Sequence, residues 1–257
     1  MRELVGPTDV QEYDNPTASP VFGDSVGLEL YDSVLDFGCG CGRLARQMVQ
    51  QVPRPGRYLG LDLHMGMIRW NRENLTRAAP EFEFLHHDIY HIGFNPSSVA
   101  PMTAPFPVQD RSISLLVAYS VFTHLTQEQC EHYLREAARV LRPDGVMIST
   151  WFLFEKALFP MMQGFQNTLY INLVDPSNAT IFDREWLVHL TSDLGLTIHR
   201  AEPPEIRGFA WKLWLTPTRP GLSGVDLPTD NAPIGRRAPP IGGSRPSMVG
   251  LGGDRQN

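Results

Sequence analysis

Short apolar stretches alternate with amphipathic stretches from Val34 onward, and this alternation limits the possible fold more than any other feature of the 257-residue chain. Apolar periodicity of this kind predicts strands separated by helices. The five strands expected first are SVLDF, RYLGLDL, FEFLHHDI, SISLLVAYS and VMISTWF. Strands joined through helices require right-handed crossovers and a parallel sheet. We therefore expect an α/β fold with a doubly wound, mostly parallel sheet.

Two later strands complete a predicted sheet of seven. They are LTIHRAEP and FAWKLWLTP, and the short connection between them contains Pro and Gly. Such a connection favours an antiparallel pair, so the last strand should run against its neighbours. Among the helices, GRLARQMVQQV places Leu44, Met48 and Val52 on one face. The helix after the fourth strand begins with a capping box of Thr126 and Gln129.

Composition divides the chain into three parts. Residues 1–30 are rich in Pro, Gly and Asp and should form an irregular lead-in with little helix, followed by one folded domain over residues 31–216. The last 41 residues, 217–257, hold eight Gly and seven Pro without an aromatic side chain. Such a segment buries too little apolar surface to offset its ordering entropy, so we expect it to be disordered.

Charge and cysteine content exclude several classes of partner. The net charge is −6 and there is no block rich in Lys or Arg, which argues against a nucleic-acid partner. The N-terminus has no apolar leader and no run approaches the ~18 apolar residues of a membrane span, so we expect a cytoplasmic protein. The three cysteines form neither a disulfide framework nor a zinc pattern, so no bound metal is expected.

The stretch VLDFGCGCGRLARQM carries three glycines, Gly38, Gly40 and Gly42, between the first strand and the first helix. Read from Gly40, the spacing fits G-x-G-x-x-A with Ala45, so a nicotinamide or flavin cofactor stays open. A phosphate-binding P-loop is excluded because no Gly-Lys-Ser/Thr follows. Asp36, two residues before the first glycine, would repel a pyrophosphate. It favours a ligand that carries an ammonium group.

These residues resemble the class I S-adenosylmethionine-dependent methyltransferases. Five segments match the family's motifs in order, over roughly Ser33 to Pro217: VLDFGCGCGR, YLGLDLHMGMI, FLHHDI, FPVQDRSISLLVAYSVFTHL and AARVLRPDGVMIST. Ser114 departs from the pattern, because many members carry Asp there. The resemblance implies a Rossmann-like fold with S-adenosylmethionine as cofactor and S-adenosylhomocysteine as product.

The resemblance also implies roles for individual residues. The glycine loop and the helix after it would hold the methionine end, with Asp36 facing the ammonium group. Asp62, which ends the second strand, would accept both ribose hydroxyls. Asp88, which ends the third strand, would accept from the adenine amine. The other expected cofactor contacts are Gly38, Cys39, Gly40, Gly42, Leu63, Met67, Ile89 and Tyr119, although Met67 also suits a core position and the cysteines suit small packing positions.

His124 follows the fourth strand in YSVFTHL, where open α/β sheets bind their ligands. There it could take a proton from an acceptor hydroxyl as the methyl group transfers, or it could only order the loop. His86, His87 and His91 form a cluster with Asp88, which we interpret as a strand end and a solvated loop rather than a metal site.

The identity of the methyl acceptor is constrained mainly by a motif that the sequence lacks. Enzymes that methylate adenine or glutamine carry an Asn/Asp-Pro-Pro-aromatic motif where this chain reads AYSVF. We therefore expect O-methylation of a small molecule such as a sugar, lipid or secondary metabolite, by a monomer or homodimer that binds neither nucleic acid nor membrane. Residues 155–180 should help to shape the acceptor pocket. A non-catalytic cofactor-binding scaffold or partner subunit, or a nicotinamide-dependent oxidoreductase, remains the alternative.

Overall fold

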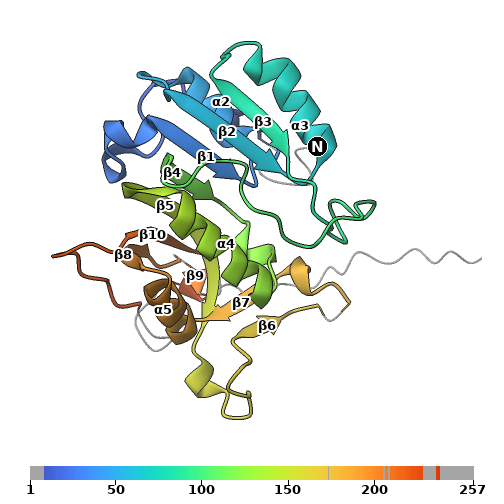
Figure 1. Cartoon of the computed structure of the whole chain (residues 1–257), viewed down its shortest axis with the longest axis vertical. Helices are drawn as coiled ribbons and strands as arrows, with labels where there is room; N and C mark the ends of the chain where they lie inside the picture. Colours follow the sequence, from blue (N-terminus) through green and yellow to red (C-terminus); the bar gives the residue numbers. More distant parts are fainter. Residues whose placement is uncertain (1–8, 173, 205, 208, 228–235, 238–257) are drawn as a thin grey trace, which may run out of the picture.

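The computed structural model describes residues 9–172, 174–204, 206–207, 209–227 and 236–237 (Figure 1). Seven strands form the main sheet in the order β3-β2-β1-β4-β5-β10-β8. Their bounds are β1 Ser33–Phe37, β2 Arg57–Asp62, β3 Phe82–His86, β4 Ile113–Ala118, β5 Leu141–Phe154, β8 Leu196–Glu202 and β10 Trp211–Pro217. Strand β10 runs antiparallel to both β5 and β8, while the pairs among β1 to β5 are parallel. The predicted mostly parallel, Rossmann-like sheet with an antiparallel last strand is therefore confirmed.

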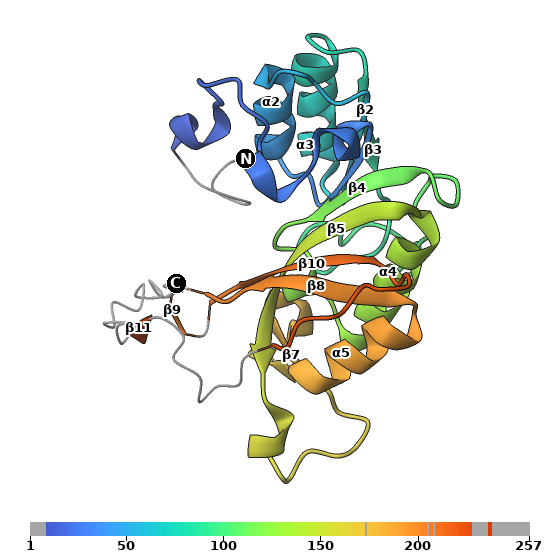
Figure 2. The same ribbon diagram turned by 90° about the vertical axis from the view of Figure 1, so that its left-hand side faces the viewer.

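Helices cover both faces of this sheet. They are α2 Arg43–Gln50, α3 Met65–Asn71, which continues as a π-helical turn over Arg72–Thr76, α4 Gln127–Val140 and α5 Arg184–Asp193. Side chains that alternate along β1 enter opposite cores: Val34 packs in the core of α2 and α3, and Leu35 in the core of α4 and α5. Figure 2 shows α4 and α5 together beside β5, β8 and β10. Burial on both faces explains the continuous apolar strands of the sequence.

The start of α4 confirms the predicted capping box. The Thr126 hydroxyl accepts from the Gln129 amide at 3.3 Å, and the Thr126 amide donates to Gln129 Oε1 at 2.9 Å.

The prediction for Val52 was wrong. Helix α2 ends at Gln50, and Val52 lies beyond it with 72% of its surface exposed.

The segment between β5 and α5 adds a small extension to the sheet. It contains the short turns η6 Lys156–Leu158 and η7 Pro176–Asn178 and a hairpin of β6 Thr168–Tyr170 with β7 Thr180–Asp183. Strand β7 also pairs in parallel with the last residues of β5, from Phe152 to Phe154. Figure 1 shows this segment in yellow, projecting beyond the end of the main sheet. The hairpin had no counterpart among the predicted strands.

The two ends of the chain are described only in part. From residue 9 onward the lead-in forms three short 3-10 turns, η1 Val10–Tyr13, η2 Gly23–Ser25 and η3 Leu28–Tyr31. Residues 218–227 lie beside β8, where the Val225 amide donates to the Ile198 carbonyl at 2.9 Å. A two-residue strand, β11 Arg236–Arg237, pairs with β9 Ile206–Arg207. The rest of the tail predicted to be disordered, and residues 1–8, lie outside the described residues. Within the described part, no helix is long and apolar enough to cross a membrane.

Candidate functional site

A cavity of about 430 Å³ lies at the carboxyl ends of β1, β2 and β4. Open α/β sheets bind ligands at this edge. Nine of the twelve residues predicted for the site line it: Asp36, Gly38, Cys39, Gly40, Asp62, Leu63, Ile89, Tyr119 and His124. The remaining three, Gly42, Met67 and Asp88, do not.

The glycine loop forms the floor of this cavity. Gly38, Gly40 and Gly42 have φ angles of 80°, 52° and 78°, a region that L side chains rarely adopt. The amides of Gly38 and Cys39 both donate to the Leu61 carbonyl, at 2.8 and 3.0 Å, which folds the loop across the end of β2. Helix α2 then begins at Arg43 with no side chain capping its first amides. Those amides and the helix dipole can receive a carboxylate.

Asp36 is the buried carboxyl group beneath the loop. Only 4% of its surface is exposed, and it accepts a hydrogen bond from the Tyr58 hydroxyl. Burial raises the pKa of Asp36 to about 7, with the Tyr58 hydrogen bond opposing the rise, Asp62 adding to it and Arg43 opposing it. An ammonium group at this point would restore the charged form, because an opposite charge favours ionisation.

Asp62 connects the loop to the start of α3. Its Oδ2 accepts from the Gly40 amide and its Oδ1 from the His64 amide, both at 2.8 Å. Burial raises the pKa of Asp62, while the hydrogen bonds from His64 and Gly40 lower it. The carboxylate therefore lies at the cavity wall with its two oxygens oriented by backbone donors. A carboxylate accepts more than one hydrogen bond per oxygen, so both oxygens keep capacity for a ligand.

Three predicted residues lie elsewhere for identifiable reasons. Strand β3 ends at His86, two residues earlier than predicted, and the exposed Asp88 side chain accepts instead from Asn95 Nδ2 at 2.9 Å. Met67 is fully buried and packs with Tyr13 and Cys41. Gly42, with a φ of 78°, forms the turn that precedes α2 and does not line the cavity.

His124 lies in the turn η5 Phe122–His124 and lines the cavity. Its Nδ1 lies 3.0 Å from the Ser177 carbonyl oxygen. A carbonyl can only accept, so Nδ1 carries the hydrogen and Nε2 holds a lone pair in the neutral ring. Ser177 is fixed in turn by the cap of η7, where Asp175 accepts from the Ser177 amide at 3.1 Å. The segment 155–180 therefore orients His124.

The cavity also has walls that sequence reasoning did not assign. They come from Tyr13, Phe37, Cys41, Arg43, Leu44, His91, Phe94, Ser120, Val121, Leu125 and Gln129. Tyr13 belongs to the lead-in and its hydroxyl lies 3.1 Å from Cys41 Sγ. Ser120 has a φ of 55°, a left-handed conformation that costs a non-glycine residue energy. The glycine motif pointed to the loop, and the sequence analysis assigned these two positions no role of their own.

The remaining histidines of HHDIYH have separate partners. His86 Nε2 lies 2.9 Å from the Leu63 carbonyl, and His87 Nε2 lies 2.8 Å from the Tyr133 hydroxyl. His91 Nδ1 accepts from the amides of Gly93 and Phe94. Across the part of the chain that the structure describes, no group of three or more His, Cys, Asp or Glu residues is placed to hold a metal ion. The three cysteines lie buried as free thiols.

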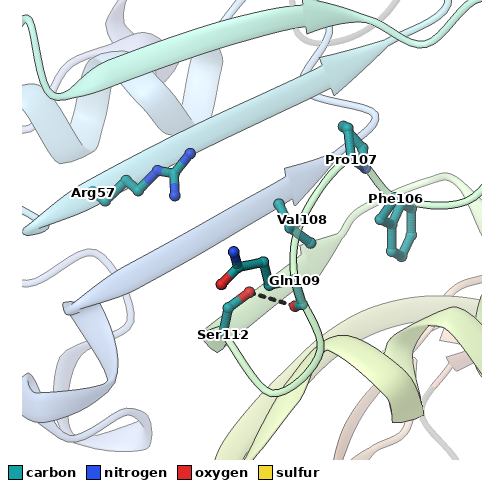
Figure 3. A pocket seen from close by; sticks show the side chains of 6 residues that line it. All are labelled: Arg57, Phe106, Pro107, Val108, Gln109 and Ser112. Carbon is teal, nitrogen blue, oxygen red and sulfur yellow. Dashed lines mark hydrogen bonds between the residues drawn. The ribbon is translucent and has the colours of Figure 1, made fainter.

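A second hollow, of about 480 Å³, lies near the amino ends of β2 and β4, away from the glycine loop (Figure 3). Arg57 of β2 faces the loop that precedes β4, in which the Ser112 hydroxyl donates to the Gln109 carbonyl at 2.6 Å. The Nη2 atom of Arg57 also lies 3.6 Å from Oε2 of Glu83. Because this edge carries the strand beginnings, we assign the functional site to the first cavity.

Comparisons with known proteins agree with this assignment. Residues 34–145 match the family model described as a methyltransferase domain, a range that contains Asp36, Asp62 and His124. The chain is 26% identical over 124 residues to an uncharacterized methyltransferase of Oceanobacillus iheyensis, a match that spans 48% of each chain. The chain thus spans about half the length of that curated relative.

Solved structures share the fold at low sequence identity. The mitomycin 7-O-methyltransferase MmcR is 16% identical with a TM-score of 0.52, over 81% of this chain and 53% of that one. The O-methyltransferase NcsB1 of neocarzinostatin biosynthesis is 14% identical with a TM-score of 0.50, over 75% of this chain and 50% of that one. That structure contains S-adenosylmethionine and 2-hydroxy-5-methyl naphthoic acid.

Proposed function

We propose that the chain, whose residues 34–145 match the methyltransferase-domain model, is a class I S-adenosylmethionine-dependent methyltransferase that methylates a hydroxyl group of a small molecule. The observation that carries the proposal is the shared cavity. Asp36 with the glycine loop, Asp62 and His124 come from three separate segments of the chain and line one space. The loop side suits the cofactor, and the His124 side suits an acceptor that must lose a proton.

The methionine end of S-adenosylmethionine fits the floor of the cavity. Its ammonium group is matched by the buried carboxyl of Asp36, and its carboxylate by the uncapped amides at the start of α2. The left-handed φ angles of Gly38, Gly40 and Gly42 fold the loop tightly at the floor of the cavity, a conformation that glycine adopts without strain. Tyr13, from the lead-in, closes the floor beside Cys41.

The nucleoside end fits the wall formed by β2 and the segment after β3. Asp62 has both oxygens held by backbone donors and can accept the two ribose hydroxyls. Leu63 and Ile89 supply apolar surface for the adenine ring. Asp88 faces Asn95 rather than the cavity, so its predicted adenine contact would need the side chain to turn.

When bound, the cofactor supplies an electrophilic methyl group on a sulfonium sulfur. The chain's part is to hold an acceptor hydroxyl in line with that methyl group and to remove its proton. His124 Nε2 can accept this proton because the Ser177 carbonyl holds the ring hydrogen on Nδ1. The same carbonyl stabilises the imidazolium that results. His124 is thus proposed as the general base.

The resemblance to O-methyltransferases supports a hydroxyl acceptor without naming it. MmcR and NcsB1 are both O-methyltransferases, and NcsB1 is solved with a hydroxylated naphthoic acid. Sugars, lipids and secondary metabolites stay open as acceptor classes. We propose further that the lead-in and residues 155–180 serve the domain by covering the cofactor and by orienting His124. A cofactor-binding scaffold without activity is the competing account.

A screen for methyl transfer tests the proposal. The full chain is incubated with S-adenosylmethionine labelled in its methyl group, together with polyols, glycosides, phenols or hydroxylated fatty acids. We expect label in an ether product of at least one class. If S-adenosylmethionine binds but label appears only on nitrogen or carbon, or on no acceptor, the proposed hydroxyl methylation fails.

A further inference from the structure

His91 lines the same cavity as His124, but the hydrogen of its neutral ring is on the other ring nitrogen. Its Nδ1 accepts hydrogen bonds from the amides of Gly93 at 3.1 Å and Phe94 at 3.2 Å. A ring nitrogen that accepts carries no hydrogen, so the neutral ring of His91 has its hydrogen on Nε2. Within the described residues, no hydrogen bond is formed by that Nε2 atom.

The surroundings of His91 keep its ring uncharged. The side chain is buried, with 7% of its surface exposed, and burial lowers its pKa. Asp175 raises that pKa and His124 lowers it. Of these two, Asp175 caps the turn η7 that holds Ser177, and His124 contacts the same turn. His91 therefore offers the cavity a neutral hydrogen-bond donor, whereas His124 offers it an acceptor.

We infer that the acceptor carries a second oxygen, which accepts a hydrogen bond from His91 Nε2 while the reacting hydroxyl faces His124. The inference rests on the proposed hydroxyl methylation and narrows its substrate class. A protonated Nε2 cannot remove a proton from an acceptor hydroxyl, so the oxygen on His91 is held and left unmethylated. The hydrogen-bond donor His91 and the proton acceptor His124 together then determine which oxygen of the substrate is methylated.

Beside His91 and His124, the cavity wall on the acceptor side combines apolar side chains with the polar Ser120 and Gln129. Phe94, Val121 and Leu125 line it, and the Phe94 ring lies 5.1 Å from the His91 ring. Gln129 also reaches the cavity, but its side chain amide is already bonded to the Thr126 amide and the Met102 carbonyl. The class that fits is a small molecule with an apolar body, a reacting hydroxyl and a neighbouring hydroxyl, ether or carbonyl oxygen.

Isosteric substrate pairs test this inference. The probes are 2-methoxyphenol against 2-ethylphenol, 3-methoxyphenol against 3-ethylphenol, and 2-methoxycyclohexanol against 2-ethylcyclohexanol. Each pair differs only by the replacement of the accepting oxygen with a methylene group. We expect kcat/KM for methyl transfer to favour the methoxy member of at least one pair by about tenfold, the size of one good hydrogen bond. Equal rates within every pair that reacts would overturn the inference.

Two substitutions separate a donor from a merely structural role. His91→Asn keeps an acceptor for the Gly93 and Phe94 amides but removes the Nε2 donor, whereas His91→Gln keeps a donor near the Nε2 position. We expect the methoxy preference to vanish in His91→Asn and to persist in His91→Gln. A preference that survives in His91→Asn would assign His91 to the turn alone.

Nitrogen spectroscopy decides the ring chemistry without a turnover assay. In the ¹⁵N-labelled full chain at pH 7, we expect His91 to be protonated on Nε2 and His124 on Nδ1. A charged His91, or one protonated on Nδ1, contradicts the inference. If S-adenosylmethionine binds and no acceptor of the wider screen is methylated while these tautomers are observed, the proposed hydroxyl methylation fails and the assignment of the ring hydrogen of His91 stands.

Discussion

The Nδ1 atom of His124 lies 3.0 Å from the carbonyl oxygen of Ser177, although the two residues are 53 positions apart. This hydrogen bond joins the turn after β4 to the segment between β5 and α5. It fixes the ring hydrogen on Nδ1 and leaves Nε2 as the acceptor in the cavity. The orientation of a predicted catalytic side chain is thus set by a backbone group outside the five matching motifs that carry the family resemblance.

Replacement of His124 should abolish turnover while cofactor binding persists. We expect His124→Ala to lower kcat by about 10²- to 10⁴-fold, the range for loss of a general base. His124→Asn is the matched variant, because its amide can still donate to the Ser177 carbonyl but it has no base at the Nε2 position. The two variants should be equally slow in a labelled-methyl assay and should bind S-adenosylmethionine with wild-type affinity. Turnover that persists in either one contradicts the base assignment.

The raised pKa of Asp36 predicts a pH dependence of stability. With a pKa of about 7 in the fold against 3.8 in the unfolded chain, the folded carboxyl binds a proton that the unfolded one has lost between these values. The stability contributed by this group is fully present below about pH 4 and is lost as the pH rises through 7. Asp36→Asn should therefore gain stability relative to wild type from pH 4 to pH 8 in urea unfolding without cofactor. A difference that is constant with pH would show that Asp36 has an ordinary pKa.

Asp36 also predicts how cofactor affinity depends on pH. Binding of an ammonium group favours the ionised carboxylate, so affinity for S-adenosylmethionine should rise with pH up to about 7 and then level off. In Asp36→Asn the affinity should be lower and this rise should be absent. Titration calorimetry between pH 5 and pH 8 measures both effects. If the affinity of the variant rises with pH as it does in wild type, a group other than Asp36 causes the pH dependence.

Gly38→Ala should destabilise the glycine loop through two effects. Gly38 has a φ of 80°, and a Cβ atom there would overlap the Val121 side chain. Gly195 is the matched control, since its φ of 71° brings the same strain but no atom lies within 4 Å of its Cβ position. We expect Gly195→Ala to cost about 1–2 kcal/mol of unfolding free energy from backbone strain. Gly38→Ala should cost more and should also weaken cofactor binding; equal costs with intact binding would show that Val121 yields freely.

Thr126→Ala should destabilise the fold without touching the cavity. The Thr126 hydroxyl caps α4 by accepting from the Gln129 amide. Its loss should cost about 1 kcal/mol in urea unfolding. Thr126→Ser retains the hydroxyl and should unfold close to wild type. An equal loss in both variants would place the effect in the threonine methyl group rather than in the cap.

The sheet was predictable because its strands are buried on both faces. Val34 and Leu35 enter opposite cores, so the strand appears in the sequence as an unbroken apolar run. The same reasoning failed for Val52, where a helical spacing continues past the end of α2 at Gln50. It also missed β6 and β7, which have three and four residues and depend on pairing with β5 rather than on a pattern of their own.

The glycine-loop side of the cavity was more predictable than the side around His124. Asp36, Gly38 and Gly40 belong to one short motif whose spacing carries its geometry. His91, in contrast, was interpreted from the sequence as part of a solvated loop rather than as a site residue. Its role in the cavity depends on which ring nitrogen meets the Gly93 and Phe94 amides, and only the folded backbone determines that.

Titration calorimetry of the full chain with S-adenosylmethionine, and in parallel with NADH, tests the central claim most directly. The claim is that Asp36 and the glycine loop form the site for the methionine end of the cofactor. We predict one equivalent of S-adenosylmethionine bound by wild type, markedly weaker binding by Asp36→Asn, and no heat with NADH. Heat with NADH but none with S-adenosylmethionine would revive the oxidoreductase, and no heat with either would show that the cavity binds neither cofactor; both results contradict the account.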